Sequence, residues 1–252
     1  MHPNQRLLNG FDGHQVEEVR EALAAGADAV SPIDGKTPLV WLLEQYLRSD
    51  RLKTCIQLLL DHGAKPDDPY LLPVIMNDGN RVRELGRSQP EMVHRRYSMV
   101  STFVSLRDVT LLHVAAEYGC EESAIALLDC GASVDAIAGF DANGMNGHTP
   151  LFHTVNSNAN RSAGVMRVLL AAGANPKHRV RGLVWGEGFP WETLFVDVSP
   201  ISFAQMGLLP QVHRDEVQIY DNLRVLSDIA GEPLPEWRNV PNRYLVGSGH
   251  SG

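Results

Sequence analysis

The stretch of sequence that decides the fold is residues 108–135, which read DVTLLHVAAEYGCEESAIALLDCGASVD. A threonine, Thr110, opens the stretch, and in other copies Thr37 and Thr149 hold the same place, where the hydroxyl of either can cap a helix. Two alanines follow, and small side chains of this kind let two helices approach closely. Two leucines then precede Gly131, a residue that can take the left-handed conformation that ends a helix. The stretch therefore predicts a short helix, a turn and a second apolar helix.

The same sequence pattern recurs elsewhere in the chain, which predicts a fold built from repeats. One further copy runs from a Thr-Pro-Leu opening to His62-Gly63-Ala64, and another runs from Thr149-Pro150-Leu151 to Gly173-Ala174-Asn175. Gly26-Ala27 supplies a fourth Gly-Ala closing. Proline suits the first position of a helix, because its missing amide is not needed there. The residues that we expect to hold the repeats together are Thr37, Pro38, Leu39, Gly63, Thr110, His113, Gly131, Thr149, Pro150 and Gly173.

This pattern resembles the ankyrin repeat, which opens with T-P-L-H-x-A and has a period of about 33 residues. The resemblance covers residues 10–232 and implies an all-α helical solenoid of about six repeats, with capping repeats and extended β-hairpin loops. It also implies that His113 forms hydrogen bonds between repeats. The implied repeats are approximately 1–33, 34–67, 68–107, 108–140, 141–180 and 199–232, with a hairpin insertion at 181–198 and a Pro- and Gly-rich tail at 233–252.

Three copies are degenerate. Residues 14–27 predict a good second helix but only a poor first one, as in an N-terminal cap. Residues 69–87 keep the apolar positions but lack both the opening and the Gly-Ala closing. The last copy opens at Ser199-Pro200 and closes near Gly231.

Three connections exceed the short loop, or finger, that joins successive repeats in a plain array. Residues 97–106 alternate enough for a short hairpin, and residues 136–147 predict a flexible loop. Residues 183–198 predict a hairpin whose arms pair across Gly186-Glu187-Gly188. In its second arm Leu194, Val196 and Val198 point one way and Trp191, Thr193 and Phe195 the other, so we expect one face to pack on the solenoid and the other to be exposed. Its aromatic residues are candidates for partner binding, since exposed Trp and Phe anchor interfaces; they are Trp185, Phe189, Trp191 and Phe195. Alternatively, the tail around Trp237 covers the exposed face of this hairpin.

An arginine-rich run precedes the fourth copy. It contains Arg81, Arg83, Arg87 and then His94-Arg95-Arg96-Tyr97. Such a run fits a solvated helix face, and it also fits a patch for an acidic partner. Arg95, Arg96 and Tyr97 therefore join the candidate partner-binding residues.

Motifs for catalysis, metals and cofactors are missing from the sequence. The loop from Asp141 to Asn146 lacks the fifth and twelfth ligands of a calcium-binding EF-hand. The C-terminal GxGxxG has no helix after it, so it does not predict a dinucleotide site. We expect His148 and His153 to be structural or solvated, and the three cysteines, Cys55, Cys120 and Cys130, to be free packing residues.

The composition bounds the class of protein. The chain has 252 residues, 44% of them hydrophobic, and a formal net charge of −8, which argues against a nucleic-acid partner. Three cysteines without a CxxC pair suit a reducing compartment. No leader or membrane span is evident, so we expect a cytoplasmic monomer; a chain whose leader had been removed would show the same pattern.

The resemblance implies a non-enzymatic protein–protein interaction module that presents a concave surface of fingers and first helices. The alternative is a dedicated inhibitor or immunity-type protein that occludes one enzyme, because three enlarged loops in a small array favour a specialised partner. An enzyme with a site in the long loops is a third reading, although no nucleophile and base are paired there at a recognisable spacing.

Overall fold

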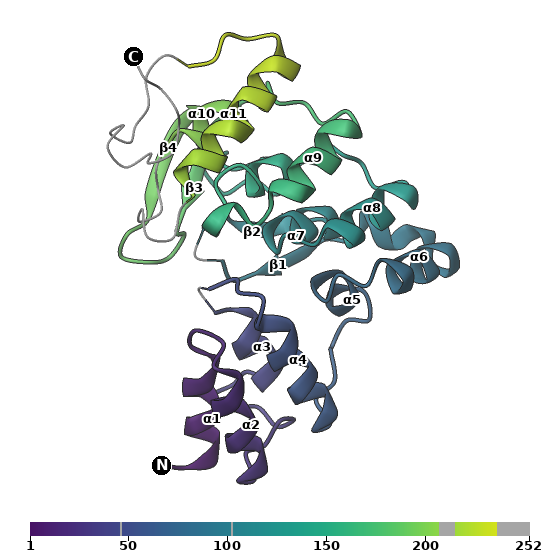
Figure 1. Cartoon of the computed structure of the whole chain (residues 1–252), viewed down its shortest axis with the longest axis vertical. Helices are drawn as coiled ribbons and strands as arrows, with labels where there is room; N and C mark the ends of the chain where they lie inside the picture. The colour runs from purple at the N-terminus through teal and green to yellow at the C-terminus, as the bar shows by residue number, and fades with distance from the viewer. Residues whose placement is uncertain (46, 102, 207–214, 236–252) are drawn as a thin grey trace. The chain divides into compact units, whose positions relative to one another are not determined.

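The structure is a computed structural model that describes residues 1–45, 47–101, 103–206 and 215–235. Trp237, the residue expected to cover the hairpin, lies outside these described residues, as does most of the tail. The chain divides into two compact units, Met1–Leu72 and Pro73–Gly252. Each unit is a set of helix pairs, and each is described separately below (Figure 1).

The first unit contains four helices, α1 (Pro3–Phe11), α2 (Val16–Ala24), α3 (Pro38–Leu43) and α4 (Leu52–Asp61). Helix α1 packs on α2 and α3, while α2 packs on α4, so first helices stack on first helices and second on second. The expectation of a poor first helix at the N-terminus is wrong. Pro3 lies in the first turn of α1, and Leu7 and Phe11, four residues apart on one face, are fully buried.

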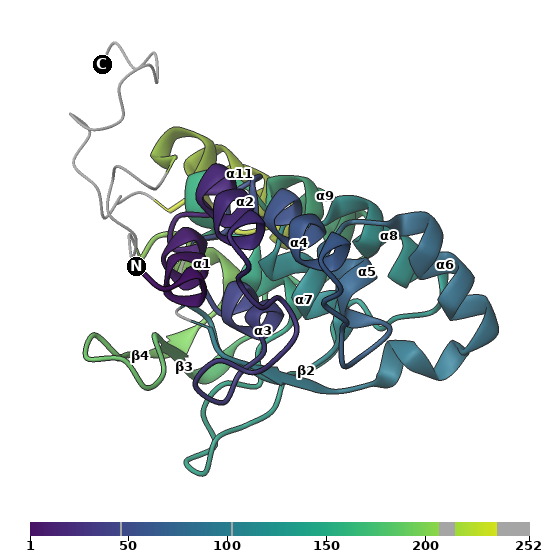
Figure 2. The same cartoon turned by 90° about the horizontal axis from the view of Figure 1, so that it is seen from below.

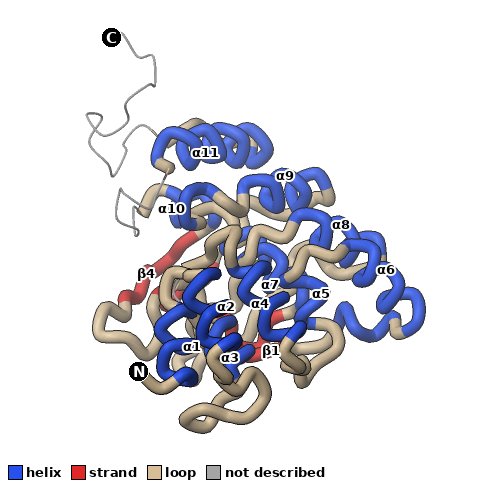
Figure 3. Tube along the Cα trace, turned by 60° about the horizontal axis from the view of Figure 1, so that its bottom comes forward, coloured by secondary structure: helices blue, strands red, loops and turns tan. Residues whose placement is uncertain are grey.

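The second unit continues the same pairing. Each short first helix or 3-10 turn is followed by a longer second helix, and α6, α8, α9 and α11 follow one another as a row (Figure 3). Residues from the end of α5 contact α8, η2 lies against α7, and α10 packs on α11. The helical elements are α5 (Leu71–Ile75), α6 (Gly79–Ser88), η1 (Pro90–His94), α7 (Leu111–Glu117), α8 (Glu121–Asp129), η2 (Pro150–His153), η3 (Asn158–Asn160), α9 (Ala163–Ala171), α10 (Pro200–Ala204) and α11 (Glu216–Ala230).

The four Gly-Ala steps end their helices with one shared geometry. The glycine φ angles are all between 88° and 91°, and the following alanine amide donates to the carbonyl oxygen five residues before it, at 2.9–3.0 Å. Glycine adopts such a φ without the steric penalty of a Cβ. The paired 6→1 and 5→2 bonds form a Schellman motif. The steps are Gly26-Ala27, Gly63-Ala64, Gly131-Ala132 and Gly173-Ala174.

The openings are less uniform than the closings. Thr37 caps α3 by accepting from the Val40 amide, whereas Thr110 forms a reciprocal capping box with His113. Ser199 and Ser202 form the same kind of box at α10. The cap expected at Thr149 is wrong, because its buried hydroxyl has no hydrogen-bond partner among the described residues. The segment after it is a 3-10 turn, η2, rather than an α-helix.

The second unit is not all-α, because two antiparallel hairpins are inserted between its helix pairs. The first pairs β1 (Tyr97–Met99) with β2 (Leu106–Val109). The second pairs β3 (Val180–Trp185) with β4 (Thr193–Val198), with Leu183 opposite Phe195. The turn between β3 and β4 is longer than expected, since it runs from 186 to 192. Figure 2 shows this turn projecting away from α8 and α9.

Within the described part of the chain, no helix is both long enough and apolar enough to cross a membrane.

Candidate functional site

The β3–β4 hairpin is fixed to the second unit by two loops from earlier in the chain. The Asn146 amide donates to the Gly182 carbonyl at 2.7 Å, and the Asn146 side-chain oxygen accepts from the Val184 amide at 3.0 Å. At the other end of β3, the Gly186 amide donates to the Phe103 carbonyl at 2.9 Å. Two of the enlarged connections therefore converge on the hairpin that forms the third.

A charged cluster fixes the turn of this hairpin. The Ser105 hydroxyl donates to the Glu187 carboxylate at 2.8 Å, and Arg107 forms an ion pair with the same carboxylate. Glu187 thus joins the turn between β3 and β4 to the loop and strand that precede α7. A lone two-stranded hairpin is marginally stable in water, so these attachments are what hold it in one position.

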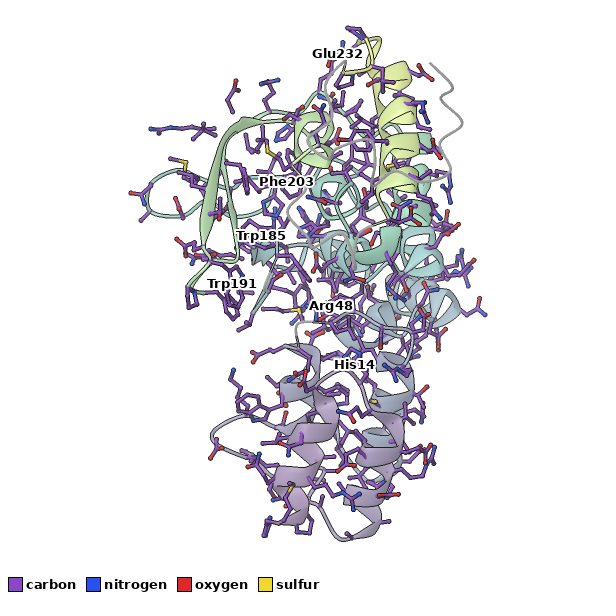
Figure 4. All side chains as sticks on the ribbon, turned by 60° about the vertical axis from the view of Figure 1, so that its left-hand side comes forward. His14, Arg48, Trp185, Trp191, Phe203 and Glu232 are labelled. Atoms are coloured by element: carbon purple, nitrogen blue, oxygen red, sulfur yellow. The ribbon has the colours of Figure 1, made fainter. Side chains whose placement is uncertain are left out.

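One face of the hairpin is buried against α10. Leu183 is fully buried opposite Phe195, and the centroid of the Phe195 ring lies 6.4 Å from that of the Phe203 ring in α10. Phe195, a candidate partner-binding residue, is therefore half-buried and contributes to the attachment of the hairpin. In Figure 4, Phe203 lies farther from Trp191 than Trp185 does, away from the turn end of the hairpin.

The opposite face of β4 is apolar and exposed. Leu194 is 49% exposed and Val196 is 68% exposed. Leu194 lies opposite Val184 on β3, and Val196 lies opposite Gly182. Because Gly182 has no side chain, the Met145 sulfur can lie close to it. One face packs and the other stays open, as the alternation along the second arm predicts. Leu194 and Val196 are not among the partner-binding candidates that the sequence indicates, although its alternation predicts that they share a face.

The turn of the hairpin carries a second exposed apolar group. The Trp191 and Phe189 rings stack, with centroids 4.8 Å apart and planes 18° from parallel, and Trp191 is 45% exposed. Trp185 is half-buried, and its ring contacts Phe103 at 6.4 Å. Both tryptophans lie toward the turn end of the hairpin (Figure 4). Hereafter, Phe189, Trp191, Leu194 and Val196 are called the hairpin surface.

The arginine-rich run is largely engaged with its own unit. Arg81 pairs with Glu84, and Arg83 pairs with Asp129. The Arg96 guanidinium donates to the Asp108 and Ile137 carbonyls at 3.0 and 2.6 Å. Arg95 is exposed after η1, and Tyr97 is half-buried in β1. The structure thus gives Arg96 a bracing role, and the solvated-face reading accounts for the paired members of the run.

A cluster of buried histidines joins the fourth and fifth copies. The Thr110 amide donates to His113 Nδ1, so the proton of that ring is on Nε2, which lies 3.3 Å from the His148 carbonyl. His153 Nε2 lies 3.1 Å from His148 Nε2, and its Nδ1 lies 2.9 Å from the Glu117 carboxylate. Burial is the main reason that the pKa values of His113 and His148 fall well below 6.5.

The histidine cluster is a structural site rather than a metal site. Across the described residues, no group of three His, Cys, Asp or Glu side chains could hold a metal ion. His148 and His153 belong to this buried network, so the solvated alternative for them is wrong.

All three cysteines are free thiols. Cys55 and Cys120 are fully buried, and burial raises the pKa of the Cys55 thiol to about 11. Cys130 is half-buried at the end of α8. A thiol that is protonated at neutral pH is a poor nucleophile, so Cys55 fits the packing role expected for it.

The stacked helix pairs with identical glycine closings define a helical repeat protein. Residues 107–138 match the family model "Ankyrin repeat". The resemblance seen in the sequence is thereby confirmed. A curated relative, the B-cell lymphoma 3 protein homolog of Mus musculus, is 39% identical over 67 residues. That alignment covers 27% of this chain and 13% of the relative's length.

Asn146 is the positioning residue that the sequence analysis missed. It is 1% exposed and has a φ of +70°, a conformation that asparagine tolerates better than most residues. The sequence analysis considered it only as part of a rejected calcium loop. The adjacent Gly147 and Gly144 signal a turn, but the contact with β3 is long-range and no local pattern encodes it.

Proposed function

We propose that this chain is a non-enzymatic protein–protein interaction module, a solenoid of about six ankyrin-like repeats that presents a concave surface of fingers and first helices. The hairpin surface is its principal anchor for a protein partner. The observation that carries this proposal is a set of exposed apolar residues, on one face of β4 and in the turn before it, on a hairpin that other parts of the chain hold in place. Trp191, Leu194 and Val196 are each between 45% and 68% exposed.

Rigidity supports the binding role of this hairpin. Ordering a loop on binding costs free energy, and a loop that is already ordered avoids that cost. Asn146 holds β3, and Glu187 joins the hairpin turn to Ser105; neither residue belongs to the hairpin surface. Tryptophan is also the residue type most enriched among interface hot spots, and Trp191 lies on the Phe189 ring ready to enter a partner pocket.

The alternative function is a dedicated inhibitor or immunity-type protein that occludes one enzyme. The convergence of two enlarged connections on a third favours it, since loops 103–107 and 140–147 both contact the β3–β4 hairpin. A surface assembled from three insertions suits one specialised partner better than many.

The remaining features follow from the same proposal. We expect a cytoplasmic monomer that needs no metal or cofactor and binds neither nucleic acid nor membrane. The formal net charge of −8 supports this, because it opposes both self-association and polyanion binding.

Capture of the native partner tests the proposal. The tagged chain and its Trp191→Ala variant are used to recover partners from the native source, with Ile229→Ala as the control because Ile229 is an exposed apolar residue on α11. Trp191→Ala should weaken the complex by about 2 kcal/mol or more while barely changing the melting temperature. Trp185→Ala should lower stability, because that ring packs on Phe103.

The identity of the recovered protein separates the two functions. One stoichiometric enzyme whose activity the chain blocks favours the inhibitor, whereas several partners favour the interaction module. Recovery that Trp191→Ala and Ile229→Ala reduce equally would mean that the hairpin surface is not the anchor.

A further inference from the structure

The far edge of β3 is already occupied. The Gly182 carbonyl and the Val184 amide both face Asn146, and the Gly186 amide faces Phe103. Along an antiparallel strand, the backbone groups of successive residues face opposite neighbours. The groups of Leu183 and Trp185 therefore face β4, where they pair with Phe195 and Thr193.

The same alternation leaves the outer edge of β4 open. If Phe195 and Thr193 exchange hydrogen bonds with β3, the amides and carbonyls of Leu194 and Val196 must face away from it. Among the described residues, no backbone hydrogen bond joins these two residues to another segment. Two donors and two acceptors thus stand in a row on this edge.

Residues of the kinds that usually block an open strand edge lie on either side of Leu194 and Val196, but not between them. Proteins block edges with charges, proline or bulges. Here Pro190 lies in the turn before β4, and Asp197, with a φ of +52° and an ion pair to Arg179, lies after Val196. Between them, both outward-facing residues are apolar. Their side chains are those exposed on the hairpin surface.

We infer that β4 accepts an extended segment of a partner protein as an additional antiparallel or parallel strand. This inference rests on the proposed function and specifies the chemistry of its partner. Main-chain hydrogen bonds to Leu194 and Val196 supply the register, and apolar side chains at alternate positions cover the exposed face. A basic residue at the end of the partner strand complements the exposed Glu192 carboxylate.

A segment of another protein fits this edge better than a second copy of the chain. The chain carries a net charge of −8, so two copies repel each other. Pairing of β4 with another β4 would also bring a second Glu192 and Asp197 to the same short sheet. The occupant is therefore a neutral or basic strand.

Hydrogen exchange of the full chain tests the open edge without any ligand. The Phe195 amide should be protected, because it faces β3, whereas the Leu194 and Val196 amides should exchange fast. Light scattering on the same sample reports the oligomeric state. A dimer in which both amides are protected would show that a second copy fills the edge, and would overturn the inference.

Peptide selection tests the occupant. A phage-displayed library of random 12-residue peptides is panned on the immobilised full chain, and the selected sequences are synthesised. They should have apolar residues at alternate positions, and binding should slow exchange at Leu194 and Val196 by about tenfold or more. Failure to select any peptide that protects these two amides overturns the inference.

Two variants at one position separate the backbone from the side chain. Val196→Pro removes the outward amide and should lower peptide affinity by about tenfold or more, whereas Val196→Thr keeps the amide and the branched shape and should change it by less than about threefold. Protection of the Phe195 amide in the proline variant verifies that β3 and β4 still pair. Equal affinity of the two variants would refute a strand-pairing mode.

The inference can fail while the proposed function stands. A native partner that Trp191→Ala releases but Val196→Pro does not release would bind the hairpin surface without adding a strand. A partner that neither variant affects would contradict both.

Discussion

Replacement of Asn146 by alanine should loosen the hairpin from the second unit. Its side-chain oxygen accepts the Val184 amide at 3.0 Å, and Val184 is buried. Alanine removes the acceptor and leaves that amide without a partner. The substitution also places a Cβ-bearing residue that cannot bond locally at a φ of +70°.

The expected loss follows from these two terms. A buried amide left unsatisfied costs about 1–3 kcal/mol. A non-glycine residue in the left-handed region costs about 1–2 kcal/mol. Asparagine already bears part of this second cost, and its buried Nδ2 has no partner among the described residues, so Asn146→Ala should lower the free energy of unfolding by about 1–3 kcal/mol. Asn146→Gly loses only the hydrogen bond and tolerates the φ, so it should lose about 1 kcal/mol less.

Urea unfolding followed by circular dichroism measures the loss, and hydrogen exchange at the Val184 amide shows whether it is local. Asn143→Ala is the matched control, because Asn143 is exposed in the same loop and should change stability by less than about 0.5 kcal/mol. If Asn146→Ala costs no more than this control, Asn146 does not hold the hairpin and the reasoning is wrong.

Three further outcomes are expected. Acid should destabilise the chain, because burial lowers the pKa values of His113 and His148 and the unfolded chain therefore binds protons below about pH 6.5 that the native chain does not. The free energy of unfolding should fall by up to about 1.4 kcal/mol per pH unit for each histidine, and a flat profile from pH 7.5 to 5.5 would contradict this. Leu127→Ala should lower the free energy of unfolding by about 2–5 kcal/mol, and Leu128→Ala clearly less, because Leu128 is only half-buried. Urea unfolding measures both losses, and equal losses would mean that the buried face of α8 is assigned incorrectly. In native alkylation followed by mass spectrometry, Cys130 should react first and the two buried thiols only after denaturation; a Cys130 bridge to either would oppose both the register and a reducing compartment.

The sequence predicts the repeat closings well because they are local. A Schellman motif spans six residues, and only glycine takes its positive φ freely, so the sequence signal and the geometry coincide at Gly63 and Gly131. The openings are predicted less well. Thr149 has the same Thr-Pro-Leu sequence as Thr37, yet its hydroxyl forms no cap and η2 is a 3-10 turn.

The candidate site is predicted in part for a similar reason. Alternation along β4 is local, so the sequence places Leu194 and Val196 on one face. Which face is buried depends on Phe203 and Met145, which reach the hairpin from other segments. The first helix was also underestimated, because Leu7 and Phe11 become a core face only through α2 and α3.

Different residues attach the hairpin to the second unit and form its exposed surface, so the two roles can be tested by separate substitutions. Asn146 and Glu187 contact the backbone or turn of the hairpin, whereas Trp191 and Val196 face outward. Among the described residues, no hydrogen bond, ion pair or ring contact joins the two sets, so changes to one should add to changes in the other. An Asn146→Gly background should therefore weaken partner binding by the ordering cost alone. The loss caused by Trp191→Ala should then be the same in both backgrounds, as a double-mutant cycle would measure. A coupling larger than about 0.5 kcal/mol would mean that the attachment also shapes the surface that binds.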